Sequence, residues 1–197
     1  IAAAELFQFI GDIVDRLRNN GIEHHDRGWT RVEGANVAAK LFVCGDKIVF
    51  ADGDKVCDVE GNTLLHLKAN ERLIGVDAEA LYLSNVKNEI ICVINGRRTK
   101  IAATQNEIGQ LVATDNLNRY FTCDNSLVKV DPKGAVTVVN DGLQCGASLA
   151  IYPNHRLLIC NEPNTRWLFS YVLDEQGEPM AGQRFYWRYA AMHHTCH

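Results

Sequence analysis

The stretch NEIGQLVATDNLNRYFTCDNSLVKVDPKGAVTVV, residues 106–139, decides which fold the sequence predicts. Short apolar runs alternate in it with turn residues, as expected for antiparallel strands joined by tight connections. In its last turn, Asp131-Pro-Lys-Gly134, the proline fixes φ at the second position and the glycine supplies a positive φ. The stretch therefore predicts one complete antiparallel β unit, with Asn106 at its start.

Two kinds of marker recur along the chain and indicate four such units. In each unit one apolar strand ends at a polar residue, and the next strand ends at a turn that contains glycine. The polar markers are Asp52, Asn85, Asp124 and Glu162, and the glycines are Gly61, Gly96, Gly134 and Gly177. Like markers lie 33 to 43 residues apart. This interval is typical of propeller blades, which place four antiparallel strands in roughly 40 residues.

The repeats therefore predict a mainly β protein whose propeller blades run from about Leu41 to Trp187. About four blades are visible. A β-sandwich is the competing fold, because it also spaces short strands at about 8 to 12 residues. The long-period markers favour the propeller.

The N-terminal segment has a different, helical pattern. Its apolar residues share one face of a helix expected over about Ala3–Arg18, and Asn20-Gly21 is a stop signal. These residues are Leu6, Ile10, Ile13, Val14 and Leu17. We therefore expect a helix and connector over residues 1–27, propeller repeats over 28–190 and a C-terminal tail over 191–197.

Composition limits the classes of partner. The formal net charge is −4 and the pI about 6.0, so the chain has no basic footprint for nucleic acid. No apolar run approaches the roughly 18 residues that cross a membrane.

The seven cysteines form no C-x-x-C pair, and Cys92, Cys123 and Cys160 lie in apolar runs. Buried thiols in a reducing compartment, and hence a cytoplasmic location, are expected. The chain begins with Ile1, so a removed targeting signal stays open.

Specific motifs resemble a known family. After Asn106 come "LVATD", "RYFTCD" and "VKVDPKG", and later "GASLAIYPNHRLLICNEPNTRWLFSYVLDEQG". In this order they resemble the gluconolactonase, senescence-marker-protein and regucalcin family, over about Val32 to Trp187. The resemblance implies a six-bladed β-propeller, so four visible blades leave two to be supplied by further chain or by a partner copy, unless a four-bladed ring forms.

The resemblance also implies a metal-dependent lactonase with a divalent ion, calcium or zinc, in the central channel. "VEGANV" is similar to the motif that carries the glutamate ligand, which places Glu33 there, and Asn106 falls at the first asparagine ligand. The second asparagine is replaced by Ala147, which cannot bind a metal, and the final aspartate has no counterpart. Glu33 and Asn106 are thus the metal ligands that the resemblance implies.

Three other groups of residues have a functional interpretation, but each can also be explained as ordinary structure. His193, His194, Cys196 and His197 are zinc-ligand types crowded at the chain end. His24-His25-Asp26 suggests acid–base chemistry, but stands in a connector without a nucleophile motif. Arg97-Arg98 is either a solvated hairpin pair or an anion site.

Two functions follow from these patterns. The first is a metal-dependent hydrolase of sugar lactones, with a lactone or sugar-derived ligand as partner and catalytic residues still unnamed. The second is a non-catalytic propeller that binds a protein or small-molecule partner. Because a fold does not fix a function, the site has to separate them.

Overall fold

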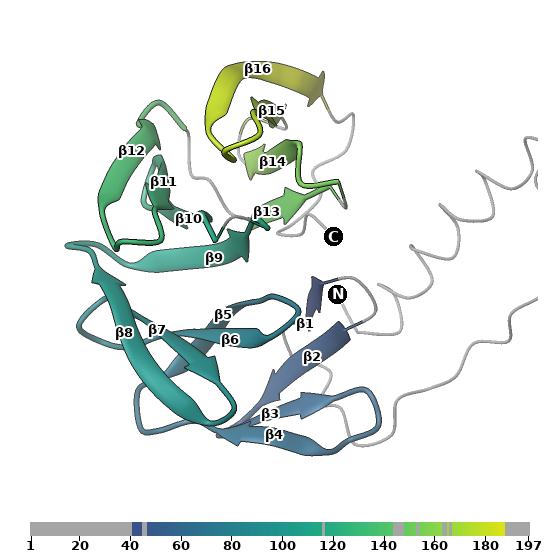
Figure 1. Ribbon diagram of the computed structural model, residues 1–197, viewed down its shortest axis with the longest axis vertical. Helices are drawn as coiled ribbons and strands as arrows, with labels where there is room; N and C mark the ends of the chain where they lie inside the picture. The colour runs from purple at the N-terminus through teal and green to yellow at the C-terminus, as the bar shows by residue number, and fades with distance from the viewer. Residues whose placement is uncertain are drawn as a thin grey trace, which may run out of the picture.

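The computed structural model describes residues 41–44, 47–115, 117–143, 148–152, 154–162, 165 and 167–187. These residues form four antiparallel sheets of four strands each, arranged around a common centre (Figure 1). The prediction of four propeller blades is confirmed. The competing β-sandwich is wrong, because it would need two sheets packed face to face rather than four separate ones. The predicted helix over Ala3–Arg18 lies outside the described residues, which contain strands and no helix.

Each blade consists of four consecutive strands, hydrogen-bonded in sequence order. Blade 1 holds β1 (Leu41–Cys44), β2 (Lys47–Asp52), β3 (Lys55–Asp58) and β4 (Thr63–His66). Blade 2 holds β5 (Arg72–Val76), β6 (Ala80–Ser84), β7 (Glu89–Ile94) and β8 (Arg97–Ala103). Blade 3 holds β9 (Ile108–Ala113), β10 (Arg119–Cys123), β11 (Ser126–Val130) and β12 (Val136–Asn140). Blade 4 holds β13 (Ser148–Ile151), β14 (Leu157–Glu162), β15 (Trp167–Leu173) and β16 (Pro179–Trp187).

The first strand of every blade is the innermost one. β1 contacts β5, β5 contacts β9, and β9 contacts β13. No contact of comparable extent joins β13 back to β1 in the described part of the chain. Figure 1 shows these strands around the centre and β4, β8, β12 and β16 on the outside.

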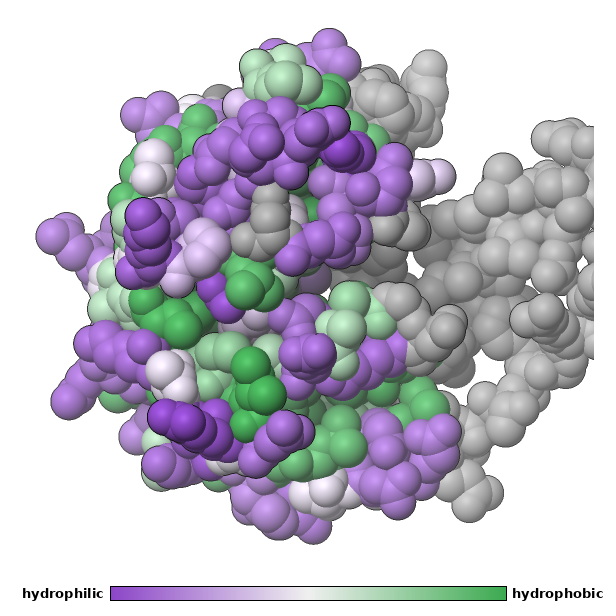
Figure 2. All heavy atoms as spheres, in the orientation of Figure 1, coloured by the Kyte–Doolittle hydropathy of each residue, from purple (hydrophilic) through white to green (hydrophobic). Residues whose placement is uncertain are grey.

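The core consists of three apolar clusters, one between each pair of neighbouring blades. In β6, Leu81 and Leu83 face blade 1, whereas Ala80 and Tyr82 face blade 3. A strand covered on both faces reads as a continuous apolar run instead of an alternating one, which explains the sequences of β6 and β10. Burial between blades leaves a surface dominated by hydrophilic side chains, with smaller hydrophobic patches, on the face in Figure 2.

The repeating markers occupy equivalent turns. The polar residues stand at the turn between the second and third strands of each blade. The glycines stand between the third and fourth strands and all have positive φ, from 72° to 86°. In blade 3, a Cβ on Gly134 would lie 2.8 Å from the Ile101 carbonyl oxygen of blade 2. Glycine at this turn thus allows both the positive φ and the close contact between blades 2 and 3.

Candidate functional site

The inner strands run side by side in one direction, so their first residues meet at one end of the channel. The guanidinium of Arg72, at the start of β5, donates to the carbonyl of Ile108, at the start of β9. Further along the same strands, a Cβ on Gly75 would lie only 2.3 Å from the Leu111 carbonyl oxygen. We call the end where the inner strands start the amino-end mouth.

Asn106 lies at this mouth, as the sequence predicted. It precedes β9 by two residues and is exposed to solvent. Its backbone carbonyl accepts hydrogen bonds from Thr104 Oγ1 at 2.8 Å and from Cys123 Sγ at 3.6 Å. No described residue forms a hydrogen bond with its side-chain amide, so the loop is fixed while the amide faces water.

A charged pair from two blades stands beside Asn106. The Arg72 guanidinium lies 2.9 Å from a carboxylate oxygen of Glu107, and the two side chains are 43% and 78% exposed. Such a guanidinium, half open to solvent, is suited to a carbonyl or carboxylate oxygen of a ligand. The sequence did not predict the Arg72–Glu107 pair. The two residues belong to different blades and meet only because blades 2 and 3 pack side by side.

Blade 4 contributes buried polar groups at the starting end of β13. Ser148 begins that strand and is 3% exposed, and Asn161 of β14 is its cross-strand partner. Asn161 is fully buried, and among the described residues neither its side-chain oxygen nor its nitrogen has a hydrogen-bond partner. Next to it, Glu162 accepts a hydrogen bond from Thr165 Oγ1 at 2.6 Å. Buried amides are nearly always paired, so the Asn161 side chain calls for a hydrogen-bond partner beyond the described residues.

The opposite end of the channel holds structural contacts between blades. One carboxylate oxygen of Asp77 accepts the backbone N–H groups of Glu79 and Ala80, and the other accepts the Tyr82 hydroxyl at 2.5 Å. Arg119 Nε donates to the same hydroxyl at 3.2 Å. Burial, followed by the hydrogen bond to Asp77, raises the pKa of Tyr82 well above its ordinary value. The hydrogen bonds of Asp77, Tyr82 and Arg119 therefore stabilise the fold.

The described residues do not fit a divalent ion. They contain no group of three or more His, Cys, Asp or Glu side chains that could hold a metal. At the mouth, Asn106 offers one neutral amide oxygen, and the charge of Arg72 opposes a cation there. Glu33 and Ala147 lie outside the described residues, as do His24, His25 and Asp26 and the histidines and cysteine of the C-terminal tail.

Arg97 and Arg98 behave differently from each other. Arg97 is exposed, whereas Arg98 donates to the carbonyl of His66 at 2.6 Å and lies 3.4 Å from Glu71 Oε2. Arg98 therefore links blade 2 to blade 1 and is not a solvated turn charge. The Glu71 carboxylate beside Arg98 also argues against an anion site, because it would repel a bound anion.

The predicted burial of three cysteines is confirmed. Cys92, Cys123 and Cys160 are all buried. Burial is the main cause that raises the pKa of both Cys92 and Cys123. A thiol with a raised pKa is a poor nucleophile, so neither residue is suited to catalysis.

Comparisons with solved structures agree with the fold. No protein-family model matches the sequence, and no curated protein matches it either. The nidogen–laminin complex contains a chain with TM-score 0.59 and 16% identity, matched over 81% of this chain and 69% of that one. The calcium-binding protein regucalcin from Agrobacterium tumefaciens has TM-score 0.55 and 13% identity, over 71% of this chain and 55% of that one. A gluconolactonase-like protein gives TM-score 0.55 and 13% identity, over 70% and 59% of the two chains.

These similarities establish the propeller fold alone. The chain spans between about half and two thirds of the length of five of the solved structures it matches. The neighbours also differ in function, since they include a streptogramin B lyase as well as regucalcin. In the described part of the chain, no helix has the length and apolar character to cross a membrane.

Proposed function

We propose that the protein binds a sugar lactone at the amino-end mouth and hydrolyses it, in the manner of the gluconolactonase-like propellers it resembles in fold. The observation that carries this proposal is the exposed side-chain amide of Asn106, unpaired among the described residues at the start of the innermost strand. The guanidinium of Arg72 stands in the same mouth, held by Glu107 at 2.9 Å.

The chemistry of a lactone suits these groups. Its ring carbonyl is an acceptor, and the Asn106 amide and the Arg72 guanidinium are donors. During hydrolysis the carbonyl oxygen gains negative charge, which a fixed guanidinium stabilises. Glu107, paired with Arg72 at this mouth, supplies a carboxylate that would accept a proton from the attacking water. Glu33 and Asn106 are the residues that would hold a divalent ion, calcium or zinc. Such an ion would supply Lewis acidity to the lactone carbonyl.

Hydrolysis of D-glucono-δ-lactone, measured by proton release above the spontaneous rate, tests the proposal. We expect Asn106→Ala to lower kcat/KM by about 10-fold or more, because a positioned donor to a developing oxyanion is lost. Gln176→Ala is the matched control, since it removes another exposed amide from a turn at the opposite end of the blades. An Asn106→Ala variant as active as the Gln176→Ala variant would show that Asn106 is only a turn residue.

The second candidate is a propeller that binds a lactone or sugar-derived ligand, or a protein, without turnover. It is favoured by the finding that the described residues include no group of metal-ligand side chains. It predicts that gluconate shifts the NMR signals of Asn106 and Arg72 while hydrolysis stays at the spontaneous rate. Hydrolysis above that rate, lost in Asn106→Ala, would exclude it.

A further inference from the structure

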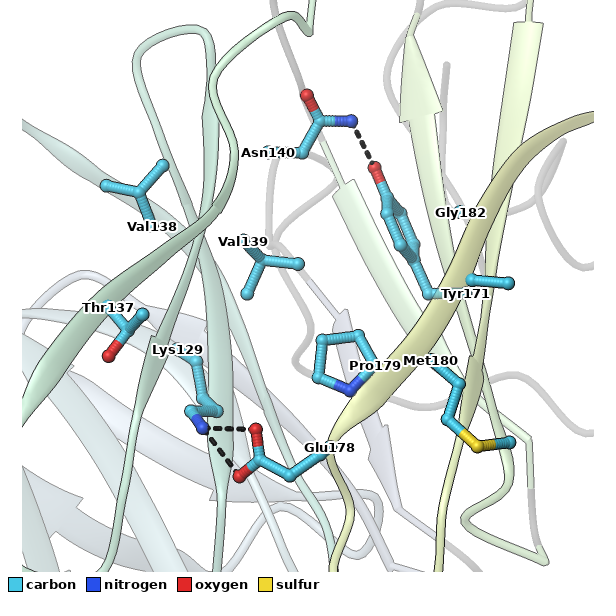
Figure 3. A pocket seen from close by; sticks show the side chains of 11 residues that line it. Lys129, Thr137, Val138, Val139, Asn140, Tyr171, Glu178, Pro179, Met180 and Gly182 are labelled. Atoms are coloured by element: carbon cyan, nitrogen blue, oxygen red, sulfur yellow. Dashed lines mark hydrogen bonds and ion pairs between the residues drawn. The ribbon is translucent and has the colours of Figure 1, made fainter.

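A groove lies between the outer strands of blades 3 and 4, away from the amino-end mouth. Its walls come from β11, β12, β15 and β16, and its volume is about 450 Å³ (Figure 3). This lies within the usual range of ligand-binding clefts, roughly 300 to 1,000 Å³. The middle of the groove is apolar, with Val139 on one side and Pro179 and Ala181 on the other.

One end of the groove holds a charged pair. Lys129 Nζ donates to both carboxylate oxygens of Glu178, at 2.6 and 2.5 Å. The Lys129 side chain is only 12% exposed, whereas that of Glu178 is 47% exposed. The nearly buried Lys129 is thus held by Glu178, whereas the half-exposed carboxylate has lone pairs left to accept further hydrogen bonds. A ligand at this end meets an acceptor and needs a donor.

The other end of the groove holds an unused donor. The backbone N–H of Gly142 donates to Asn140 Oδ1 at 2.8 Å, which fixes the orientation of the Asn140 amide. The amide nitrogen of Asn140 then donates to the Tyr171 hydroxyl oxygen at 2.7 Å. Tyr171 accepts in this bond, and no group in the described part of the chain accepts its own proton. A ligand at this end meets a donor and needs an acceptor.

Gly182 holds the Tyr171 ring in place. The two residues are cross-strand partners, and a Cβ on Gly182 would lie 2.6 Å from the ring atom Cε1. The ring thus lies flat against the backbone of β16, in the space that a larger residue would fill. Figure 3 shows Tyr171 and Asn140 at one end of the groove and Lys129 and Glu178 at the other.

We propose that this groove binds an extended peptide segment with an apolar side chain. The apolar side chain contacts Val139 and Pro179, a peptide carbonyl accepts the proton of Tyr171, and a peptide N–H donates to Glu178. β12 and β16 are the outermost strands of their sheets, so each has one edge without a neighbouring strand among the described residues. Another backbone matches the alternating N–H and C=O groups of such an edge, which a compact small molecule does not.

The test uses the full chain and a panel of fluorescein-labelled nine-residue peptides of threonine and serine. Each peptide carries one central Leu, Ile, Met, Phe or Val, and binding is measured by fluorescence polarisation. We expect at least one of them to bind with a micromolar Kd. Tyr171→Phe should weaken that binding about 5- to 10-fold, the effect of one hydrogen bond. Ala181→Trp should abolish it, because Ala181 is exposed in the groove and the indole would fill the space.

Tyr152→Phe is the matched control, because Tyr152 is 56% exposed and does not line the groove. It should bind the peptide as the parent does. Far-UV circular dichroism confirms that each variant is folded, and Ala181→Trp tests the groove even where Tyr171→Phe is unstable. The proposal is overturned when no peptide of the panel binds, or when the Tyr171→Phe and Ala181→Trp proteins bind as tightly as Tyr152→Phe. Binding of small apolar compounds without any peptide would also overturn it. Lactone hydrolysis is independent of these outcomes.

Discussion

At the residue scale, Gly75 controls how closely the inner strands approach. An added Cβ would lie 2.3 Å from the Leu111 carbonyl oxygen, which is backbone and cannot turn away. We expect Gly75→Ala to lower the free energy of unfolding by about 1–3 kcal/mol, the range for overpacked positions. Gly142→Ala is the control, because its nearest atom is 3.4 Å away. Urea denaturation of both variants measures the difference, and equal stabilities would contradict the close packing of β5 and β9.

Tyr171 gives a second prediction at this scale, on alkaline stability. Burial raises the pKa of Tyr171 to about 12, from an ordinary value of 10.0. Above pH 10 the unfolded chain releases this proton more readily than the folded protein, so stability falls as pH rises from 10 towards 12. Tyr171→Phe should therefore lose less stability between pH 9.5 and 11 (approximate limits set by these pKa values) than the parent. Urea midpoints across this range measure the effect, and parallel curves would show that Tyr171 titrates normally.

Some individual residues were predictable and others were not. Asn106 was placed correctly at the start of an innermost strand, because the apolar run after it marks that strand. Arg72 and Asn161 were missed, since their interest lies in a contact across blades and in an unpaired buried amide. Neither property leaves a trace in local sequence. Whether Asn106 takes part in catalysis remains a prediction.

At the scale of elements, three blades share one turn between their third and fourth strands. In blade 3, Asp131 Oδ1 accepts the backbone N–H groups of Lys133 and Ala135 at 2.9 and 2.8 Å. Asp174 repeats this pattern in blade 4, and Asp58 Oδ1 accepts the N–H of Asn62 in blade 1. The sequence predicted the shared pattern Asp-x-x-Gly only in part. The glycines marked all four turns, whereas a role for the aspartate was expected only at Asp131.

We expect Asp131→Ala to cost about 1–2 kcal/mol of unfolding free energy, because two backbone donors lose their acceptor in an exposed turn. Asp141→Ala, another exposed aspartate of blade 3, should change stability by less than about 0.5 kcal/mol. Thermal denaturation of the two variants separates the outcomes. If Asp131→Ala were as stable as Asp141→Ala, water would replace the side chain in this turn without loss.

The bounds of the β region were the most predictable feature at this scale. The expected β region, Leu41 to Trp187, coincides with the start of β1 and the end of β16. Apolar runs carry this information directly, because the middle strands of each blade are buried against the neighbouring blades. The pairing of Gly182 with the Tyr171 ring, which shapes the groove, follows from strand register and was beyond sequence patterns.

At the scale of the whole molecule, neighbouring blades share their cores. Leu83 is fully buried in the cluster between blades 1 and 2, although it belongs to the same strand as Tyr82, which packs towards blade 3. We expect Leu83→Ala to lower the free energy of unfolding by about 2–5 kcal/mol. Val86→Ala, at a residue 72% exposed in the following turn, should stay within about 0.5 kcal/mol of the parent. A loss below 1 kcal/mol (approximately) for Leu83→Ala would mean that the blades are held together elsewhere.

The central claim is that the amino-end mouth of this propeller binds and hydrolyses a lactone. The most direct measurement is the rate of D-glucono-δ-lactone hydrolysis, compared between the parent protein and the Asn106→Ala and Gln176→Ala variants. The account predicts hydrolysis above the spontaneous rate by the parent and by Gln176→Ala, and a kcat/KM lowered about 10-fold or more in Asn106→Ala. A parent rate equal to the spontaneous one, or equal activity in the two variants, would contradict it.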